Sequence, residues 1–163
     1  AYGGAVISNV EDERVLSLAY VAGLAPGAGQ SVAEVFFMNP AHEKAPPLAP
    51  EPDGRFWLPE GAFAEAFAQH ADQATLQLLA AVQRPIHGAA IQEPLLAPLW
   101  HSRPSWYLVA LEDRMIPVQT QRFVAGMLGA TVHEAAVDHC PMITAADAVV
   151  HLVEAAATAA RER

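Results

Sequence analysis

Residues 106–117 read WYLVALEDRMIP, and residues 129–143 read GATVHEAAVDHCPMI. Each segment holds a short apolar run of strand type, and each run leads to a polar side chain, Asp113 in the first and His139 in the second. In open parallel sheets, sites form at the carboxyl ends of the strands. A carboxylate that holds an imidazole in one tautomer makes that imidazole a general base. We therefore predict that Asp113 and His139 form a catalytic pair whose nucleophile comes from elsewhere in the chain.

The residue types alone leave other interpretations open. An aspartate in a turn often caps the loop, and a buried histidine is often a satisfied polar residue. Glu112 is the alternative acid, but adjacent residues of an extended segment point in different directions. The same reasoning disfavours the single cysteine, Cys140, as a thiol nucleophile. One cysteine also excludes an internal disulfide and a multi-cysteine metal site.

A third apolar run, VLSLAYVAGLAP at residues 15–26, has no polar alternation. Such runs are typical of strands that are buried on both faces of a parallel sheet. Helical patterns follow in residues 117–129 and 144–163, and Thr144 is the predicted N-cap of the second. Residues 1–9, AYGGAVISN, are interpreted as the start of a helix after a tight turn. The order helix, strand, insertion, strand, helix, strand, helix predicts an α/β fold, a mostly parallel sheet flanked by helices.

A long insertion separates the first two strands. We divide the chain into residues 1–24, which begin the core, residues 25–104, which form a helical cap or lid, and residues 105–163, which complete the core with the acid and base loops. Insertions beside a site commonly act as lids. Aromatic residues at helical spacing usually belong to a core, but those of the cap are also candidates for an apolar substrate pocket. The candidates are Phe56, Trp57, Phe63 and Trp100.

Composition narrows the range of partners. The net charge of −9 argues against nucleic acid, because a binder needs clustered Lys and Arg to neutralise phosphates. No run reaches the roughly 18 apolar residues of a membrane span, so we expect no membrane partner. The histidines of the cap are not clustered with carboxylates, so we predict no metal and no cofactor. Residues 1–8 lack the basic region of a signal peptide, and we expect a cytoplasmic protein.

Four segments, in the right order, resemble the α/β-hydrolase family, and in particular the small esterase branch of methyl-ester esterases and hydroxynitrile lyases. AYGGAVI resembles the chain after the nucleophile in Gly-x-Ser-x-Gly-Gly, and VLSLAYVAGLAPGAGQS resembles the next strand and its exit. WYLVALEDRMIP resembles the acid strand, and DHCPMI resembles the base loop. The resemblance covers nearly the whole chain and corresponds to the C-terminal two-thirds of a family member. It implies an α/β-hydrolase fold with Asp113 as the acid and His139 as the base.

The chain departs from the family motif at residue 1. Matching Tyr2, Gly3 and Gly4 to x-Gly-Gly places Ala1 at the position of the nucleophilic serine. The resemblance also implies that the backbone N–H of Tyr2 is an oxyanion donor. Three explanations for Ala1 are open: an engineered change that traps substrate, a naturally inactive binding relative, or a sequence that begins at a break. We expect an upstream segment, covalent or separate, to supply the missing N-terminal strands, because an inner strand would otherwise present an unpaired edge.

The resemblance implies a carboxylic ester hydrolase of the serine type. With alanine at residue 1, such a protein would bind an apolar small-molecule ester and scarcely turn it over. Two alternatives stay open, a non-catalytic small-molecule binding protein and an enzyme similar to the hydroxynitrile lyases. The lyases of this branch carry a lysine directly after the histidine, where this chain has Cys140.

Overall fold

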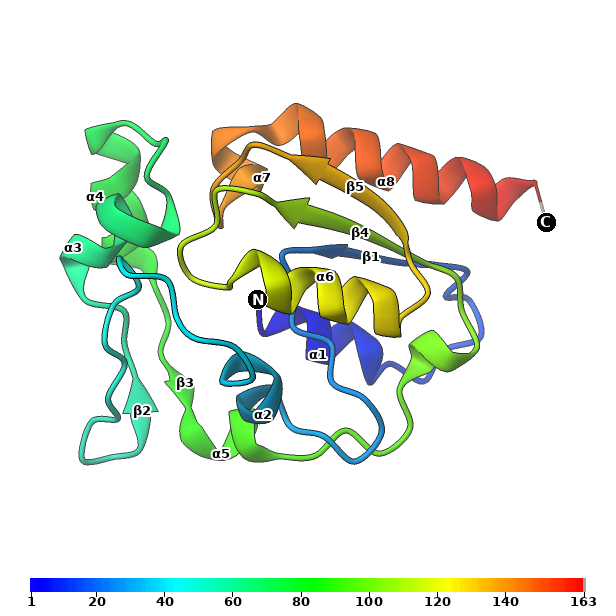
Figure 1. The fold of residues 1–163 in the computed structure, drawn as a ribbon, viewed down its shortest axis with the longest axis horizontal. Coiled ribbons are helices and arrows are strands. Elements are labelled where there is room, and N and C mark those ends of the chain that lie inside the picture. The colour runs from blue at the N-terminus through cyan, green and yellow to red at the C-terminus, as the bar shows by residue number, and fades with distance from the viewer. Residues whose placement is uncertain (163) are drawn as a thin grey trace.

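The computed structural model describes residues 1–162 (Figure 1). Its strands are β1 (Leu18–Val21), β2 (Arg55–Phe56), β3 (Ile86–His87), β4 (Ser105–Ala110) and β5 (Thr131–Ala135). Its α-helices are α1 (Gly3–Ser8), α2 (Val32–Phe36), α3 (Glu60–Ala62), α4 (Gln73–Val82), α5 (Gly88–Gln92), α6 (Val118–Met127), α7 (Pro141–Thr144) and α8 (Ala146–Arg161). A π-helical turn, η1 (Phe63–Phe67), and a 3-10 turn, η2 (Leu99–His101), complete the elements. Within this part of the chain, no helix combines the length and the apolar content needed to cross a membrane.

Strands β1, β4 and β5 form a parallel sheet in the order β1-β4-β5. In its register, Tyr20 of β1 lies opposite Tyr107 of β4, which lies opposite Val132 of β5. Helix α6 connects β4 to β5, because parallel neighbours need a crossover. The predicted α/β class, with a parallel sheet flanked by helices, is confirmed.

Different helices cover the two faces of this sheet. On one face, Tyr20 and Tyr107 pack in a large apolar cluster with residues of α1, α2 and α6. On the other face, Trp106 and Leu108 pack against Leu152 of α8. Every residue of β4 is buried, as a central strand covered on both faces requires. The two layers of helices hold the ends of β4 and β5 in fixed positions.

The chain after α2 leaves the sheet and builds the cap. Strands β2 and β3 pair antiparallel, with Phe56 opposite Ile86. Helix α3 and the turn η1 lead to α4, and residues 68–72 join the two helical parts. Figure 1 shows α3 and α4 beyond the arrowheads of β4 and β5. The cap therefore lies beyond the carboxyl ends of the strands, where the acid and base loops begin.

The first predicted strand is shorter than its apolar run. The run covers residues 15–26, but the regular strand ends at Val21, because Ala22 turns the chain with a positive φ of 44°. Leu24 stays buried after the turn, which explains why the sequence remains apolar there. Val35 of α2 belongs to the same cluster as β1, so the first part of the 25–104 insertion packs within the core.

The predicted N-cap of the last helix is wrong. Helix α8 begins after Ala145, whose side chain makes no capping bond. Thr144 ends the preceding helix α7 instead, and its hydroxyl donates a 2.6 Å hydrogen bond to Asp138 Oδ1. The threonine thus stabilises the base loop and leaves the helix end uncapped.

Candidate active site

Asp113 and His139 meet above the carboxyl ends of β4 and β5. Asp113 follows β4 by three residues and His139 follows β5 by four. His139 Nδ1 lies 2.7 Å from Asp113 Oδ2, and both side chains are buried. An imidazole whose Nδ1–H donates to a carboxylate has its Nε2 free as a proton acceptor. The pair has the arrangement of a general base and the acid that orients it.

The carboxylate of Asp113 is held by more than its histidine. Its Oδ1 accepts from the backbone N–H groups of Met115 at 2.7 Å and Ile116 at 2.9 Å. Its Oδ2 also accepts from Gln121 Nε2 at 2.9 Å. Charge-assisted bonds of this kind fix the position of the carboxylate and compensate its burial. The loop capping considered for Asp113 and its role as partner of His139 thus occur together.

Gln121 is a site residue that the sequence interpretation missed. It lies on α6, is fully buried, and its Oε1 accepts from the N–H of Ala110 at 2.9 Å. Its Nε2 donates to Asp113 Oδ2 and to the carbonyl of Ile116, each at 2.9 Å. The only hint in the sequence is a polar residue in a helix whose neighbours Val124 and Ala125 are apolar, a weak signal by itself. The side chain ties the end of β4, the acid loop and α6 together.

Phe67 of the π-helical turn covers the imidazole of His139. The two rings meet edge to face, with centroids 5.3 Å apart. An aromatic ring in this position limits the orientation of the imidazole and excludes water from one side of it. Turns of the π type often mark functional sites.

Ala1 and Tyr2 lie where α1 begins. The carbonyl of Ala1 accepts from the N–H of Leu24 at 2.9 Å and from the N–H of Gly4 at 3.1 Å. The same oxygen therefore binds both the turn after β1 and the first turn of α1. Gly4 is needed here, because a Cβ on it would lie 2.6 Å from the carbonyl oxygen of Leu24. Tyr2 is the N-cap residue, and the N–H groups at a helix start have no partner within the helix. The N–H of Tyr2 thus lies at a helix start, and its role as an oxyanion donor stays a prediction.

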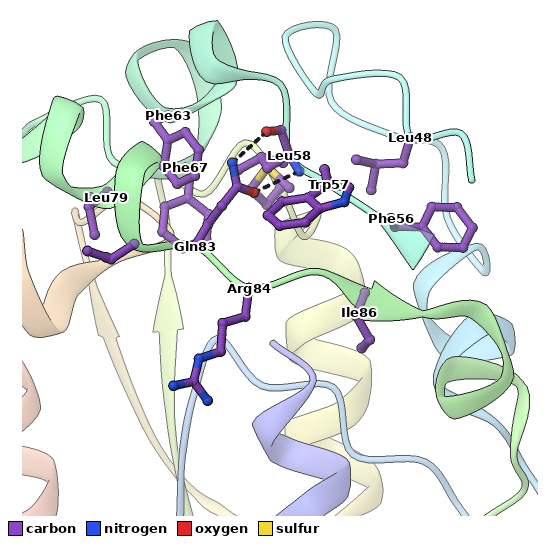
Figure 2. Close-up of a pocket in the computed structure, with 12 residues that line it drawn as sticks. Leu48, Phe56, Trp57, Leu58, Phe63, Phe67, Leu79, Gln83, Arg84 and Ile86 are labelled. Carbon is purple, nitrogen blue, oxygen red and sulfur yellow. Dashed lines mark hydrogen bonds between the residues drawn. The ribbon is translucent and has the colours of Figure 1, made fainter. Parts of the chain in front are cut away.

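Two apolar cavities lie beneath the cap. One, of about 370 Å³, is lined by the predicted pocket residues Phe56, Trp57 and Phe63 and by Phe67. Figure 2 shows its aromatic wall, with the Gln83 amide paired to the backbone of Leu58 by two bonds of 3.1 Å. The second cavity, of about 250 Å³, reaches Ala1 and Tyr2. Both cavities share three lining residues: Leu48, Phe56 and Ile86.

Trp100 lines neither of these two cavities, although it is one of the predicted pocket residues. It belongs to the 3-10 turn η2, packs against the main core cluster, and donates from Nε1 to the carbonyl of Pro26 at 3.3 Å. His101 meets its ring edge to face. The tryptophan therefore packs the C-terminal end of the insertion against the core.

The alternative site residues have other partners. Glu112 Oε2 lies 2.8 Å from His70 Nε2. The thiol of Cys140 is buried and lies 3.2 Å from the sulfur of Met142. Burial, together with the nearby Asp138 carboxylate, raises the pKa of this thiol to about 11, which disfavours a thiolate. Within residues 1–162, no group of three or more His, Cys, Asp or Glu side chains is placed to hold a metal ion.

A parallel sheet with a cap at its carboxyl edge, and an aspartate and a histidine joined on neighbouring loops, is the arrangement of an α/β-hydrolase. The sequence matches the alpha/beta hydrolase family over residues 1–152. The chain therefore belongs to the α/β-hydrolase family, which confirms the predicted membership. A search of curated proteins found no match.

The fold is similar to several solved structures. Polyneuridine aldehyde esterase superposes with a TM-score of 0.70 at 18% identity, over 87% of this chain and 62% of that one. A second similar structure is an extracellular α/β-hydrolase from a Paenibacillus species, which is described as sharing structural and functional homology with tobacco salicylic acid binding protein 2. It superposes with a TM-score of 0.66 at 21% identity, over 88% of this chain and 62% of that one. The pyrethroid hydrolase PytH, solved with BIF, superposes with a TM-score of 0.74 at 16% identity, over 99% of this chain and 69% of that one. The chain thus spans 62% of the length of the first two of these proteins.

Proposed function

We propose that this chain is the larger part of a carboxylic ester hydrolase of the serine type, in which alanine occupies the position of the nucleophile. The observation that carries the proposal is the 2.7 Å contact between Asp113 Oδ2 and His139 Nδ1 at the capped edge of the sheet. Family membership supports a hydrolase, and the esterases among the similar structures support an ester as the substrate.

In the active form, serine at residue 1 attacks the ester carbonyl while Nε2 of His139 accepts the hydroxyl proton. Asp113 keeps the imidazole in the right tautomer and stabilises the imidazolium that forms. The N–H of Tyr2 donates to the oxyanion of the tetrahedral intermediate. His139 then returns the proton to the departing alcohol, and water hydrolyses the acyl-enzyme by the same steps.

The cavities support an apolar substrate. The walls near Ala1 include Leu24, Val32 and Phe36, and the larger cavity is lined by aromatic and aliphatic side chains of the cap. Burial of an apolar group contributes about 25 cal/mol per Å² of area removed from water. We infer that one cavity receives the acyl group and the other the alcohol group of an apolar ester.

With Ala1, the same site binds the ester and loses its covalent route. Enzymes that lack one member of such a triad keep about 10³ to 10⁴-fold acceleration over water, from binding and the oxyanion hole. The test is to change Ala1→Ser in the full-length protein and to measure the hydrolysis of p-nitrophenyl esters. A large gain is expected, and the absence of any gain would exclude the proposed role of residue 1.

A non-catalytic binding protein is the second candidate. Ala1 in the nucleophile's place, beside an apolar cavity, favours this alternative directly. It predicts that apolar esters bind to the Ala1 protein with the same Kd as to the Ala1→Ser protein, and that neither protein hydrolyses them. Isothermal titration and an ester assay on the same two proteins separate the two functions.

A further inference from the structure

A short segment of the cap, residues 65–70, contacts the acid and base loops. Arg114 Nη1 of the acid loop donates to the carbonyl of Glu65 at 2.8 Å. Phe67 meets the ring of His139, and Gln69 Nε2 donates to the carbonyl of Glu112 at 2.7 Å. We call this set of contacts, together with those of His70, the cap seam. It touches the residues on both sides of Asp113 and the imidazole of His139.

His70 is the member of the cap seam that contacts both loops. Its Nε2 lies 2.8 Å from Glu112 Oε2, on the residue before Asp113. Its backbone N–H donates to Asp138 Oδ2 at 3.1 Å, on the residue before His139. Its Nδ1 lies 3.9 Å from the same Asp138 oxygen. One cap residue therefore bridges the neighbours of the acid and the base.

Asp138 transmits this contact to the base loop. Its side chain is fully buried. Its Oδ1 accepts from the N–H of Cys140 at 3.0 Å and from the hydroxyl of Thr144 at 2.6 Å. The carboxylate of the residue before His139 thus binds two residues after it, while its other oxygen accepts from the backbone N–H of His70. His70 is therefore linked through Asp138 to the loop that carries the base.

We propose that His70 is a positioning residue, which uses its bonds to Glu112 and Asp138 to hold the cap against both loops and to align His139 with Asp113. This inference rests on the proposed hydrolase function. Reacting groups must be placed within a fraction of an ångström, and a displacement of about 1 Å costs on the order of 10²-fold in rate. Removing the imidazole of His70 breaks its contact with Glu112 and leaves the backbone bond to Asp138 in place. This change is expected to lower kcat more than it raises KM, because the cavity walls near Ala1 come from other residues.

The first measurement does not depend on ester hydrolysis. In the full-length protein, the proton between His139 Nδ1 and Asp113 gives a downfield ¹H NMR resonance, which reports the alignment of the pair. His70→Ala is expected to shift this resonance upfield or broaden it by exchange with water. Glu112→Ala removes the same bond from the core side and is expected to do likewise. His70→Gln, which keeps a donor near Glu112, is expected to preserve most of the signal.

Asp72→Ala is the matched control. Asp72 lies two residues from His70 and caps α4 through a 2.7 Å bond from the N–H of Thr75, so its loss weakens the cap helix without touching the seam. The control should leave the resonance in place. An unchanged resonance in His70→Ala and Glu112→Ala, or an equal change in Asp72→Ala, overturns the proposal.

The second measurement uses the Ala1→Ser protein. His70→Ala is expected to lower kcat for a p-nitrophenyl ester roughly 10 to 100-fold, with KM changed less than about threefold. His70→Gln should recover most of kcat, and a rise in KM alone would contradict the positioning role. If Ala1→Ser shows no hydrolysis, the proposed function fails, while the NMR comparison still decides whether His70 aligns the pair.

Discussion

Gln121 donates a 2.9 Å hydrogen bond to Asp113 Oδ2, the same oxygen that lies 2.7 Å from His139 Nδ1. A helix residue therefore sets the position of the acid, and through the acid it sets the base. Gln121 also bonds the backbone of Ala110 and Ile116, so its amide contacts the residues before and after Asp113 as well as Asp113 itself. Helix α6 thus contacts the acid directly, and the cap contacts the acid loop through Gln69 and Glu65.

The first prediction concerns this amide. Gln121→Leu leaves the N–H of Ala110 buried without its partner and Asp113 with one donor fewer. We expect a loss of about 1–3 kcal/mol in the free energy of unfolding for each buried group left unsatisfied. Urea unfolding monitored by circular dichroism measures it. Gln119→Leu, at an exposed position of the same helix, is the control and should change stability by less than about 0.5 kcal/mol.

The second prediction compares two glycines in α1. Gly4→Ala places a Cβ 2.6 Å from the Leu24 carbonyl oxygen, a backbone atom that cannot swing away. Overpacking of this kind costs about 1–3 kcal/mol. Gly3→Ala meets nothing within 4 Å and, as a helix residue, should stabilise by up to about 1 kcal/mol. Equal thermal unfolding midpoints for the two variants would contradict the packing of α1 against the turn after β1.

The third prediction tests the cavities. Phe56 lines both of them, so Phe56→Ala should weaken the binding of an apolar ester roughly 10-fold or more through lost apolar contact. Trp100→Phe removes the bond to Pro26 at the far side of the insertion. It should lower stability by about 1 kcal/mol and leave ligand affinity unchanged. An affinity loss in Trp100→Phe equal to that in Phe56→Ala would argue against the assigned pocket.

The fourth prediction follows from the thiol of Cys140. Burial raises its pKa from 9.0 to about 11, so the neutral thiol is favoured and the reactive thiolate forms only at higher pH. At pH 8, native protein should react with iodoacetamide far more slowly than urea-unfolded protein, in which the pKa returns to its ordinary value. Mass spectrometry of the alkylated cysteine follows both rates. Equal rates at pH 8 would show an accessible or activated thiol.

The sequence alone is sufficient to predict the parallel sheet and the contact between Asp113 and His139. Strands rich in apolar residues, such as Ser105–Ala110, carry their own signal because burial on both faces removes polar residues from them. Asp113 and His139 could be predicted because strand ends converge in a parallel sheet. The parallel sheet also fixes which edge of the molecule the cap must cover.

The supporting residues could not be predicted, because their partners are distant in the chain. His70 reaches Asp138 across 68 positions, and no local pattern encodes that contact. Thr144 has the chemistry of an N-cap, yet a buried carboxylate competes for its hydroxyl and binds it instead. Trp100 is aromatic like the pocket residues, and only the packing of η2 against the core separates it from them.

The central claim is that residue 1 holds the place of a nucleophile served by Asp113 and His139. The most direct measurement compares the hydrolysis of a p-nitrophenyl ester by three full-length proteins, with Ala1, with Ala1→Ser, and with Ala1→Ser plus Asp113→Asn. The expected gain from Ala1→Ser is about 10³-fold or more in kcat, and Asp113→Asn should remove about 10²- to 10⁴-fold of it. Equal rates for all three proteins would contradict the claim.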